Sequence, residues 1–257
     1  MTITIDRRAA HVVLTLDQPA KLNALSGVMI GQLSNAFHDI ESDSELRCVI
    51  LTGIGDKAFC AGTDIAELTQ LNEDEARKVS ERGQALCNQI ENCPLPVIGA
   101  INGIAAGGGC ELALACHIRI ASDTASFSLP ESKLGVIPAY GGTQRLAREI
   151  GNSRALDLML TGKTIGAAEA VQIGLINRLA SSRDLIVEAE SLAEEIARLA
   201  PLAIRACLKA VTLGVELPLA EGLALEAELF AALFATEDMR EGTSAFLEKR
   251  PPVFKGT

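Results

Sequence analysis

Glu111 stands where acid–base chemistry would be expected. It follows Gly107, Gly108, Gly109 and Cys110 in the stretch PVIGAINGIAAGGGCELAL. The apolar, partly β-branched run before the glycines predicts a short buried strand, and the run after them predicts a buried helix. This order leaves backbone N–H groups unpaired at the helix N-terminus. A carboxylate beside them is an acid–base group next to an oxyanion hole, although a tight packing turn capped by a glutamate explains the glycines equally well.

Glu131 is the second candidate acid. It follows Pro130 in SLPESKLG, a segment that otherwise reads as extended and apolar. Partial burial there would raise the pKa of the carboxyl group towards neutral pH. The simpler interpretation is a glutamate at the start of a helix after proline, and the residue alone favours that interpretation.

A second strand-to-helix junction runs through Cys60, Ala61, Gly62 and Thr63, behind the apolar run LRCVILT. Asp64, near the start of the following helix, by itself predicts only a cap. The junctions at Ala61 and Gly108 would each supply one N–H to a single carbonyl oxygen. Two converging amides are what an enolate or oxyanion intermediate needs.

These junctions require strand–turn–helix units, and such units recur through the first 200 residues. They predict an α/β fold built as a stacked spiral, although their irregular spacing equally allows a doubly wound sheet. Beyond residue 200 the pattern is helical alone. We therefore expect a catalytic core at 1–200 and a C-terminal helical segment at 201–257. That segment is too apolar to stand alone, so it should pack on its own core or on a neighbouring subunit.

The composition excludes several classes of protein. A chain of 257 residues with 48% apolar content and a net charge of −10 is globular and lacks the basic footprint of a nucleic-acid partner. Seven cysteines without a C-x-x-C pair, and three scattered histidines, indicate neither disulfides nor a metal site and predict a reducing cytoplasm. The chain starts on the strand-like TITID without a leader, and no apolar run approaches the roughly 20 residues that span a membrane.

Other glycine-rich or nucleophilic sites fit poorly. IAAGGGC lacks the G-x-G-x-x-G spacing of a dinucleotide site, no G-K-[ST] follows the glycines, and no G-x-S-x-G is present. Cys60 and Cys110 border the two junctions without an obvious histidine partner. We interpret both as small buried fillers.

Three longer blocks carry a resemblance to a known family. KAFCAGTDIAEL, INGIAAGGGCELALACHIRIAS and LPESKLGVIPAYGGTQRLAREIG are similar to the signature blocks of the enoyl-CoA hydratase/isomerase (crotonase) family. The similarity continues through LTGKTIGAAEAVQIGLIN to the tail EGTSAFLEKRPPVFKG. The resemblance implies a spiral of ββα units, a C-terminal helical trimerisation segment, and a homotrimer or a dimer of trimers.

The resemblance also implies the chemistry. The amides of Ala61 and Gly108 would bind the thioester oxygen, and Glu111 and Glu131 would be the two catalytic glutamates of a hydratase. Glu111 would deprotonate water at the β-carbon and Glu131 would protonate the α-carbon, with no metal or redox cofactor. The reaction would belong to fatty-acid β-oxidation or related acyl-CoA metabolism. Coenzyme A would lie along two loops, which comprise Ala20, Lys21, Leu22, Ala61, Gly62, Thr63, Asp64 and Ile65.

Three positions modify the expected substrate site. Lys21 is displaced by one position from the family pattern, so the resemblance does not decide whether it contacts a CoA phosphate. Lys255 would reach a CoA phosphate across a subunit interface, or lie solvated in the tail. Tyr140 replaces a small residue near the acyl pocket, where it would shorten the pocket or add a hydroxyl donor. The rival functions are an isomerase or another acyl-CoA activity of the family, a non-catalytic acyl-CoA binder and, against the acidic balance, an RNA binder.

Overall fold

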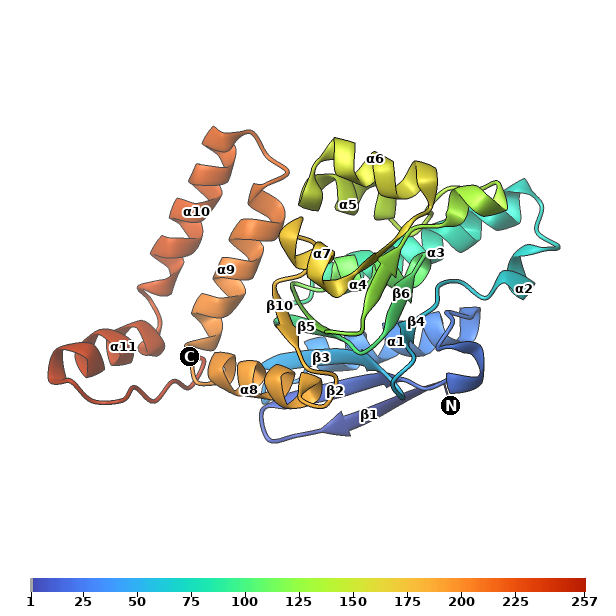
Figure 1. Ribbon diagram of the computed structural model, residues 1–257. Helices are drawn as coiled ribbons and strands as arrows, with labels where there is room; N and C mark the ends of the chain where they lie inside the picture. Colours follow the sequence, from blue (N-terminus) through green and yellow to red (C-terminus); the bar gives the residue numbers. More distant parts are fainter. Residues whose placement is uncertain (1) are drawn as a thin grey trace.

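The computed structural model of the protein describes residues 2–257 (Figure 1). Its core is built from strands that are arranged in the larger sheet in the order of the chain. The larger sheet has the order β1-β2-β3-β5-β7-β10. Only β1 and β2 are antiparallel, and each later strand adds in parallel beside the previous one. A doubly wound sheet would reverse direction from its first strand. The spiral prediction is therefore confirmed and the doubly wound alternative is excluded. The strands of this sheet are β1 (Ile3–Arg7), β2 (His11–Leu16), β3 (Cys48–Gly53), β5 (Val97–Ile101), β7 (Ile118–Ser122) and β10 (Arg178–Ala180).

A second sheet has the order β4-β6-β8-β9, and each of its strands is three residues long. The glycines of GIGDKAF (residues 53–59) predict a turn, but the first strand of this sheet begins at Ala58 and ends at Cys60, so the turn prediction is wrong for its last two residues. The reason is length, because three residues are too few to show a strand periodicity. The strands are β4 (Ala58–Cys60), β6 (Ile104–Ala106), β8 (Ser126–Ser128) and β9 (Thr164–Gly166).

Local signals set the helix boundaries. Ser26 caps the first helix through Met29 N, and Asn72 forms a reciprocal capping box with Glu75 at the third. Pro201 stands at the first turn of α9 and Pro218 precedes α10. The helices are α1 (Gly27–Glu41), α2 (Ile65–Leu68), α3 (Glu73–Glu91), α4 (Gly108–Ala115), α5 (Gly142–Ile150), α6 (Asn152–Thr161), α7 (Ala167–Gln172), α8 (Leu185–Ala197), α9 (Pro201–Gly214), α10 (Leu219–Leu233) and α11 (Glu237–Glu248), with short 3-10 helices η1 (Pro19–Lys21) and η2 (Glu131–Leu134).

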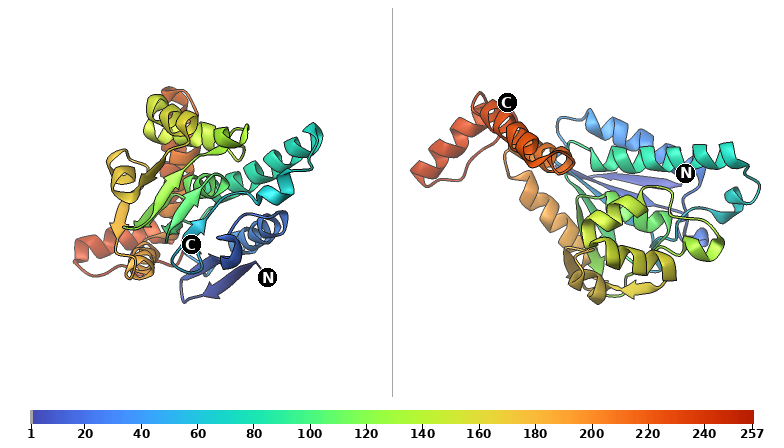
Figure 2. Two further views of the ribbon diagram at one scale, coloured as in Figure 1. Left: turned by 45° about the vertical axis from the view of Figure 1, so that its right-hand side comes forward. Right: turned by 90° about the horizontal axis from the view of Figure 1, so that it is seen from above.

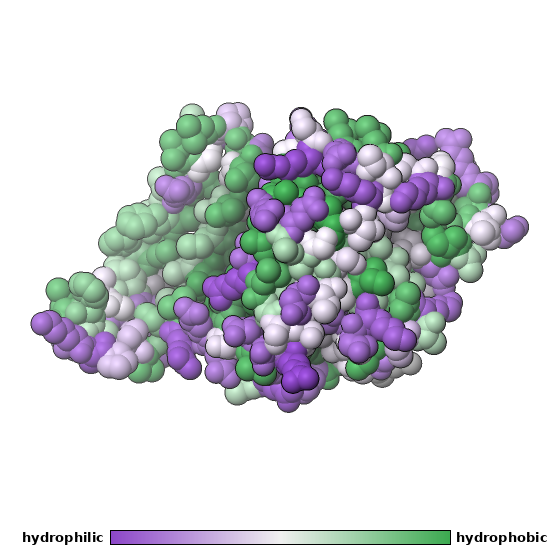
Figure 3. Space-filling model, in the orientation of Figure 1, coloured by the Kyte–Doolittle hydropathy of each residue, from purple (hydrophilic) through white to green (hydrophobic). Residues whose placement is uncertain are grey.

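Helices α9, α10 and α11 form an arm that stands away from the sheets, as two views at right angles agree (Figures 1 and 2). Helix α10 has no buried residue, although its sequence is strongly apolar. Apolar residues gather in the hollow between this arm and the body (Figure 3). Within a single chain, the apolar faces of the arm are therefore not covered by the catalytic core. Among residues 2–257 no helix is long and apolar enough to cross a membrane.

Candidate active site

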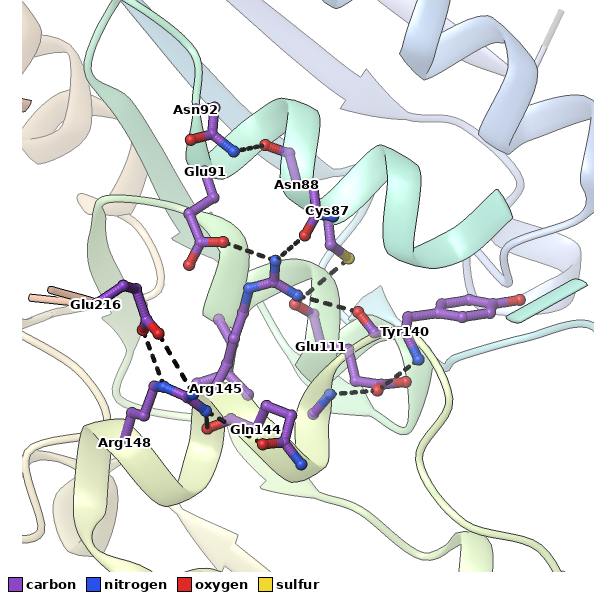
Figure 4. Close-up of polar contacts among 12 residues, drawn as sticks. Cys87, Asn88, Glu91, Asn92, Glu111, Tyr140, Gln144, Arg145, Arg148 and Glu216 are labelled. Carbon is purple, nitrogen blue, oxygen red and sulfur yellow. Dashed lines mark hydrogen bonds and ion pairs between the residues drawn. The ribbon is translucent and has the colours of Figure 1, made fainter. Parts of the chain in front are cut away.

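Glu111 lies in the first turn of α4, as predicted, with only 2% of its surface exposed. Its Oε1 accepts backbone hydrogen bonds from Tyr140 N at 2.8 Å and Gly142 N at 2.6 Å (Figure 4). Burial raises the pKa of this carboxyl group, and the two N–H donors oppose that rise. Donors that stabilise the anion prepare Glu111 to act as a base.

Glu131 opens the 3-10 helix η2 after Pro130, so it is both a helix-start glutamate and a partly buried one. Its Oε2 is buried and has no hydrogen-bond partner among the described residues. Burial raises the pKa of this carboxyl group to about 7, and the negative charge of Glu111 adds to the rise. At neutral pH a large fraction of Glu131 is therefore protonated and able to donate a proton.

Gly107 brings Glu131 against the start of α4. Its backbone has φ 51° and ψ −128°, a conformation that side chains strongly disfavour. A Cβ at this position would lie 2.9 Å from Glu131 Oε1. Since Gly107 is four residues before Glu111, the same turn positions both carboxyl groups.

The two candidate oxyanion donors have different outcomes. Gly108 N is the first N–H of α4 and has no acceptor among the described residues. Ala61 N donates to Leu22 O at 3.0 Å, so the expectation of a free N–H at Ala61 is wrong. The backbone turns at Gly62, whose φ is 100°, and neither Gly62 N nor Thr63 N has an acceptor in the described chain. Of the two residues, Thr63 has its side chain against Gly108, so we take Thr63 N as the second candidate donor.

Thr63 lies beside Gly108, so the two residues could offer their N–H groups to one oxygen atom. A Cβ built on Gly62 would be 3.3 Å from Gly108 N, and one built on Gly108 would be 3.1 Å from Thr63 Oγ1. The sequence contained this candidate, because Thr63 lies in the predicted junction. Which amide is free depends on the φ of Gly62, which the sequence does not specify.

The two loops expected to hold coenzyme A lie against each other, and they include Ala20, Gly62 and Ile65. Leu22 O binds Ala61 N, and Leu25 N donates to Gly62 O at 2.7 Å. Lys21 Nζ lies 2.5 Å from Asp64 Oδ2, so the displaced lysine is paired with an acid of the other loop. Asp64 also caps α2 through Ala66 N, which confirms the cap interpretation.

Asn23 locks the first of these loops in place. It is buried in the left-handed region at φ 57°, and its Nδ2 donates to Ala58 O at 2.8 Å. Its Oδ1 accepts from Gln18 N at 3.0 Å. One side chain therefore joins the first loop to β4, which leads directly into the Ala61 junction.

Tyr140 is 3% exposed, and its ring lies between Gly83 of α3 and Gly108. Its backbone holds Glu111, and its carbonyl accepts from Arg145 Nη1 at 3.1 Å. Arg145 Nη2 in turn bonds Asn88 Oδ1 at 2.6 Å and Glu91 Oε2 at 2.7 Å (Figure 4). Sequence reasoning missed Arg145, which ties the loop that holds Glu111 to α3.

Lys255 is not brought to this site within one chain. The tail around it is bound to the arm, with Lys255 N donating to Asp238 Oδ1 at 2.7 Å and Gly256 N to Asp238 Oδ2 at 2.9 Å. The arm lies on the opposite side of the molecule from the η1 and α2 loops (Figure 1).

An apolar cavity of about 340 Å³ adjoins the site behind Glu131. It lies between the segment that follows η2 and helices α5 and α6. Its walls include Ser132, Val136, Ile137, Met159 and Leu160. Ile137 and Leu160 are more than 70% exposed, so the cavity opens to the surface.

Known proteins match this chain over nearly its full length. The family model described as enoyl-CoA hydratase/isomerase matches residues 6–257. YngF of Bacillus subtilis is 45% identical over 244 residues, which cover 95% of this chain and 94% of that protein. The short-chain-enoyl-CoA hydratase of Clostridium acetobutylicum is 40% identical and covers 96% and 95%. The crystal structure of an enoyl-CoA hydratase from Bacillus anthracis superimposes with a TM-score of 0.97 at 40% identity, covering all of both chains. With its spiral fold and paired glutamates, this chain belongs to the enoyl-CoA hydratase/isomerase family.

Proposed function

We propose that this protein is an enoyl-CoA hydratase, which adds water to a trans-2-enoyl-CoA and gives a 3-hydroxyacyl-CoA. The observation that carries the proposal is the pair of glutamates in unlike surroundings beside two free backbone N–H groups. Relatives with printed hydratase names, including the crotonyl-CoA hydratase of Syntrophomonas wolfei at 39% identity, support it.

The reaction divides between the two carboxyl groups. The thioester oxygen accepts hydrogen bonds from Thr63 N and Gly108 N, which stabilise the charge that develops on it. Ionised Glu111 takes a proton from water as the water oxygen bonds to the β-carbon. The π electrons move towards the α-carbon, which receives the proton of Glu131. A proton then returns from Glu111 to Glu131 through solvent, so the cycle neither oxidises nor reduces and calls for no metal or redox cofactor.

Coenzyme A is assigned to the paired loops at 20–22 and 61–65, whose backbone bonds form one continuous edge. The pairing of Lys21 with Asp64 leaves backbone groups, rather than a free lysine, as the main contacts there. Lys255 contributes to this site only from another subunit, because its own tail is bound to the arm.

The apolar arm supports a homotrimer or a dimer of trimers. Val215, Leu219, Phe230, Phe246 and Leu247 are each at least 63% exposed in the single chain. Exposed apolar surface of this extent is typical of a protein interface. Sedimentation equilibrium tests the assembly, and a monomer at micromolar concentration would contradict it.

A reducing cytoplasm and a place in fatty-acid or related acyl-CoA metabolism complete the proposal. All seven cysteines are free thiols, and six of them are buried. Burial raises the pKa of Cys60 and of Cys116 to about 12, which suits packing rather than reactivity.

The test follows the loss of enoyl-thioester absorbance when purified protein is mixed with crotonyl-CoA. We expect rapid loss for the wild type and for Glu188→Gln, a control on the exposed face of α8. The double variant Glu111→Gln/Glu131→Gln should show almost none while still binding the CoA ester. Shifting of a 3-enoyl-CoA double bond without hydration would identify an isomerase and overturn the proposal.

A further inference from the structure

Tyr140 occupies space directly beside the proposed oxyanion hole. A Cβ built on Gly108 would lie 3.0 Å from Tyr140 Cε2 and 3.1 Å from its Cδ2. Gly108 N is one of the two donors assigned to the thioester oxygen. This edge of the ring therefore lies against the residue whose N–H is assigned to the acyl carbonyl.

The other edge of the ring is seated on α3. A Cβ at Gly83 would overlap the ring atoms Cγ, Cδ1 and Cε1 of Tyr140. Glycine in the middle of a 19-residue helix is less favourable than alanine, so its presence there calls for a reason. No other residue type would leave room for the ring, so the Gly83 position and the Tyr140 side chain fit as a pair. Together they fill the space between α3 and the start of α4.

The Tyr140 ring is held in a fixed position. Tyr140 N donates to Glu111 Oε1 and Tyr140 O accepts from Arg145, so a swing of the loop would release the catalytic carboxylate. The hydroxyl is buried without a hydrogen-bond partner among the described residues. Burial raises its pKa, and the Thr63 hydroxyl acts in the opposite direction. The Cβ position of Gly108 is 3.0 Å from Tyr140 Cε2 and 3.1 Å from Thr63 Oγ1, so this edge of the ring lies on the Thr63 side of the site.

We propose that the Tyr140 ring, seated on Gly83, closes the acyl site on its α3 side and restricts hydration to short acyl chains. The inference rests on the proposed hydratase function and names its substrate class. A long chain would have to displace a ring that is held by packing and by the backbone bond to Glu111.

The experiment compares kcat/KM for trans-2-enoyl-CoA esters of four and ten carbons. We expect the wild type to prefer the four-carbon ester by at least about 10-fold, the low end of pocket discrimination between apolar groups. Tyr140→Ala should raise the ten-carbon value relative to the four-carbon value by a similar factor. Tyr140→Phe, which removes only the hydroxyl, should keep the wild-type ratio. Tyr140→Leu tests the same point with a bulkier replacement if the alanine variant does not fold.

Two results overturn the inference while hydration stands. Equal rates on both esters in the wild type would mean that the chain leaves by another route, such as the cavity behind Glu131. A Tyr140→Phe variant that behaves like Tyr140→Ala would assign the limit to the hydroxyl instead of the ring. No hydration of either ester by the wild type would reject the proposed function itself, and this inference with it.

Discussion

The carboxyl group of Glu111 accepts two backbone hydrogen bonds, whereas a buried oxygen of Glu131 has none within the described chain. Both groups are buried enough to have a raised pKa. Backbone N–H groups of the 139–142 loop favour the anion of Glu111, whereas at Glu131 only its own backbone N–H acts in that direction and burial outweighs it. Two glutamates that meet at the same turn can therefore serve as a base and an acid, because their hydrogen-bonding surroundings differ.

Removing either carboxyl group should have the largest effect. Glu131→Gln cannot donate the α-proton and Glu111→Gln cannot accept one from water, so each should lower kcat by about 10²- to 10⁴-fold. Crotonyl-CoA hydration measures this, and calorimetric titration with the CoA ester should show nearly unchanged binding. If either variant kept more than about a tenth of wild-type turnover, the assigned roles would not hold.

Gly107→Ala should disturb the difference between the two glutamates by moving Glu131, without removing either carboxyl group. The new Cβ would meet Glu131 Oε1 in a disfavoured backbone conformation, so the acid should move off its site. We expect turnover to fall by roughly 10²-fold and the free energy of unfolding by about 1–3 kcal/mol. Gly166→Ala is the matched control, because its φ is −82° and no atom lies near the added methyl group. Equal losses in the two variants would show that the Gly107 turn has no special role.

The pH dependence of hydration sharpens the comparison. Hydration needs Glu131 protonated, so kcat/KM should fall as the pH rises through about 7. It should also fall at acidic pH, where Glu111 becomes protonated. In Glu131→Asp, residual activity should keep an alkaline limb, whereas in Glu131→Gln that limb should disappear. A wild-type profile that stays flat from pH 6 to 9 would argue against a protonated Glu131.

A smaller effect is expected on stability. The folded-state pKa of Glu131 is raised above the ordinary value of 4.5, so the folded protein holds a proton that the unfolded chain releases. Its contribution to stability is therefore greatest below about pH 4.5 and declines as the pH rises towards 7. Glu131→Gln should remove this decline, giving a higher Tm than the wild type at pH 8 but little difference at pH 5. Thermal melts at both pH values measure it, and a lower Tm for the variant at pH 8 would contradict it.

Much of the site could be predicted from local signals. The three glycines before Glu111 predicted its place in the first turn of α4, and the starts of α1 and α9 carry the local signals Ser26 and Pro201. The spiral followed from repeated units, but its distinction from a doubly wound sheet needed the strand order. Local sequence predicts well what neighbouring residues decide.

Other features depend on contacts that sequence spacing does not reveal. Strands β4, β6, β8 and β9 are three residues long, and each exists because it pairs with its neighbour in the second sheet. Ala61 does not offer a free amide, because its N–H binds Leu22 O, and the unpaired N–H groups of the junction follow it at Gly62 and Thr63, where Gly62 adopts a positive φ. The fit of the Tyr140 ring to Gly83 joins segments 57 positions apart.

The most direct test of the central claim is the protonation of Glu131 in the free protein. Protein labelled with ¹³C at glutamate carboxyl carbons would be titrated by NMR, and Glu131 would be assigned as the resonance lost in Glu131→Gln. We predict a midpoint near pH 7 for this resonance, with the resonance lost in Glu111→Gln titrating at lower pH. A Glu131 midpoint near 4.5, the ordinary value for glutamate, would contradict the division of the site into a base and an acid.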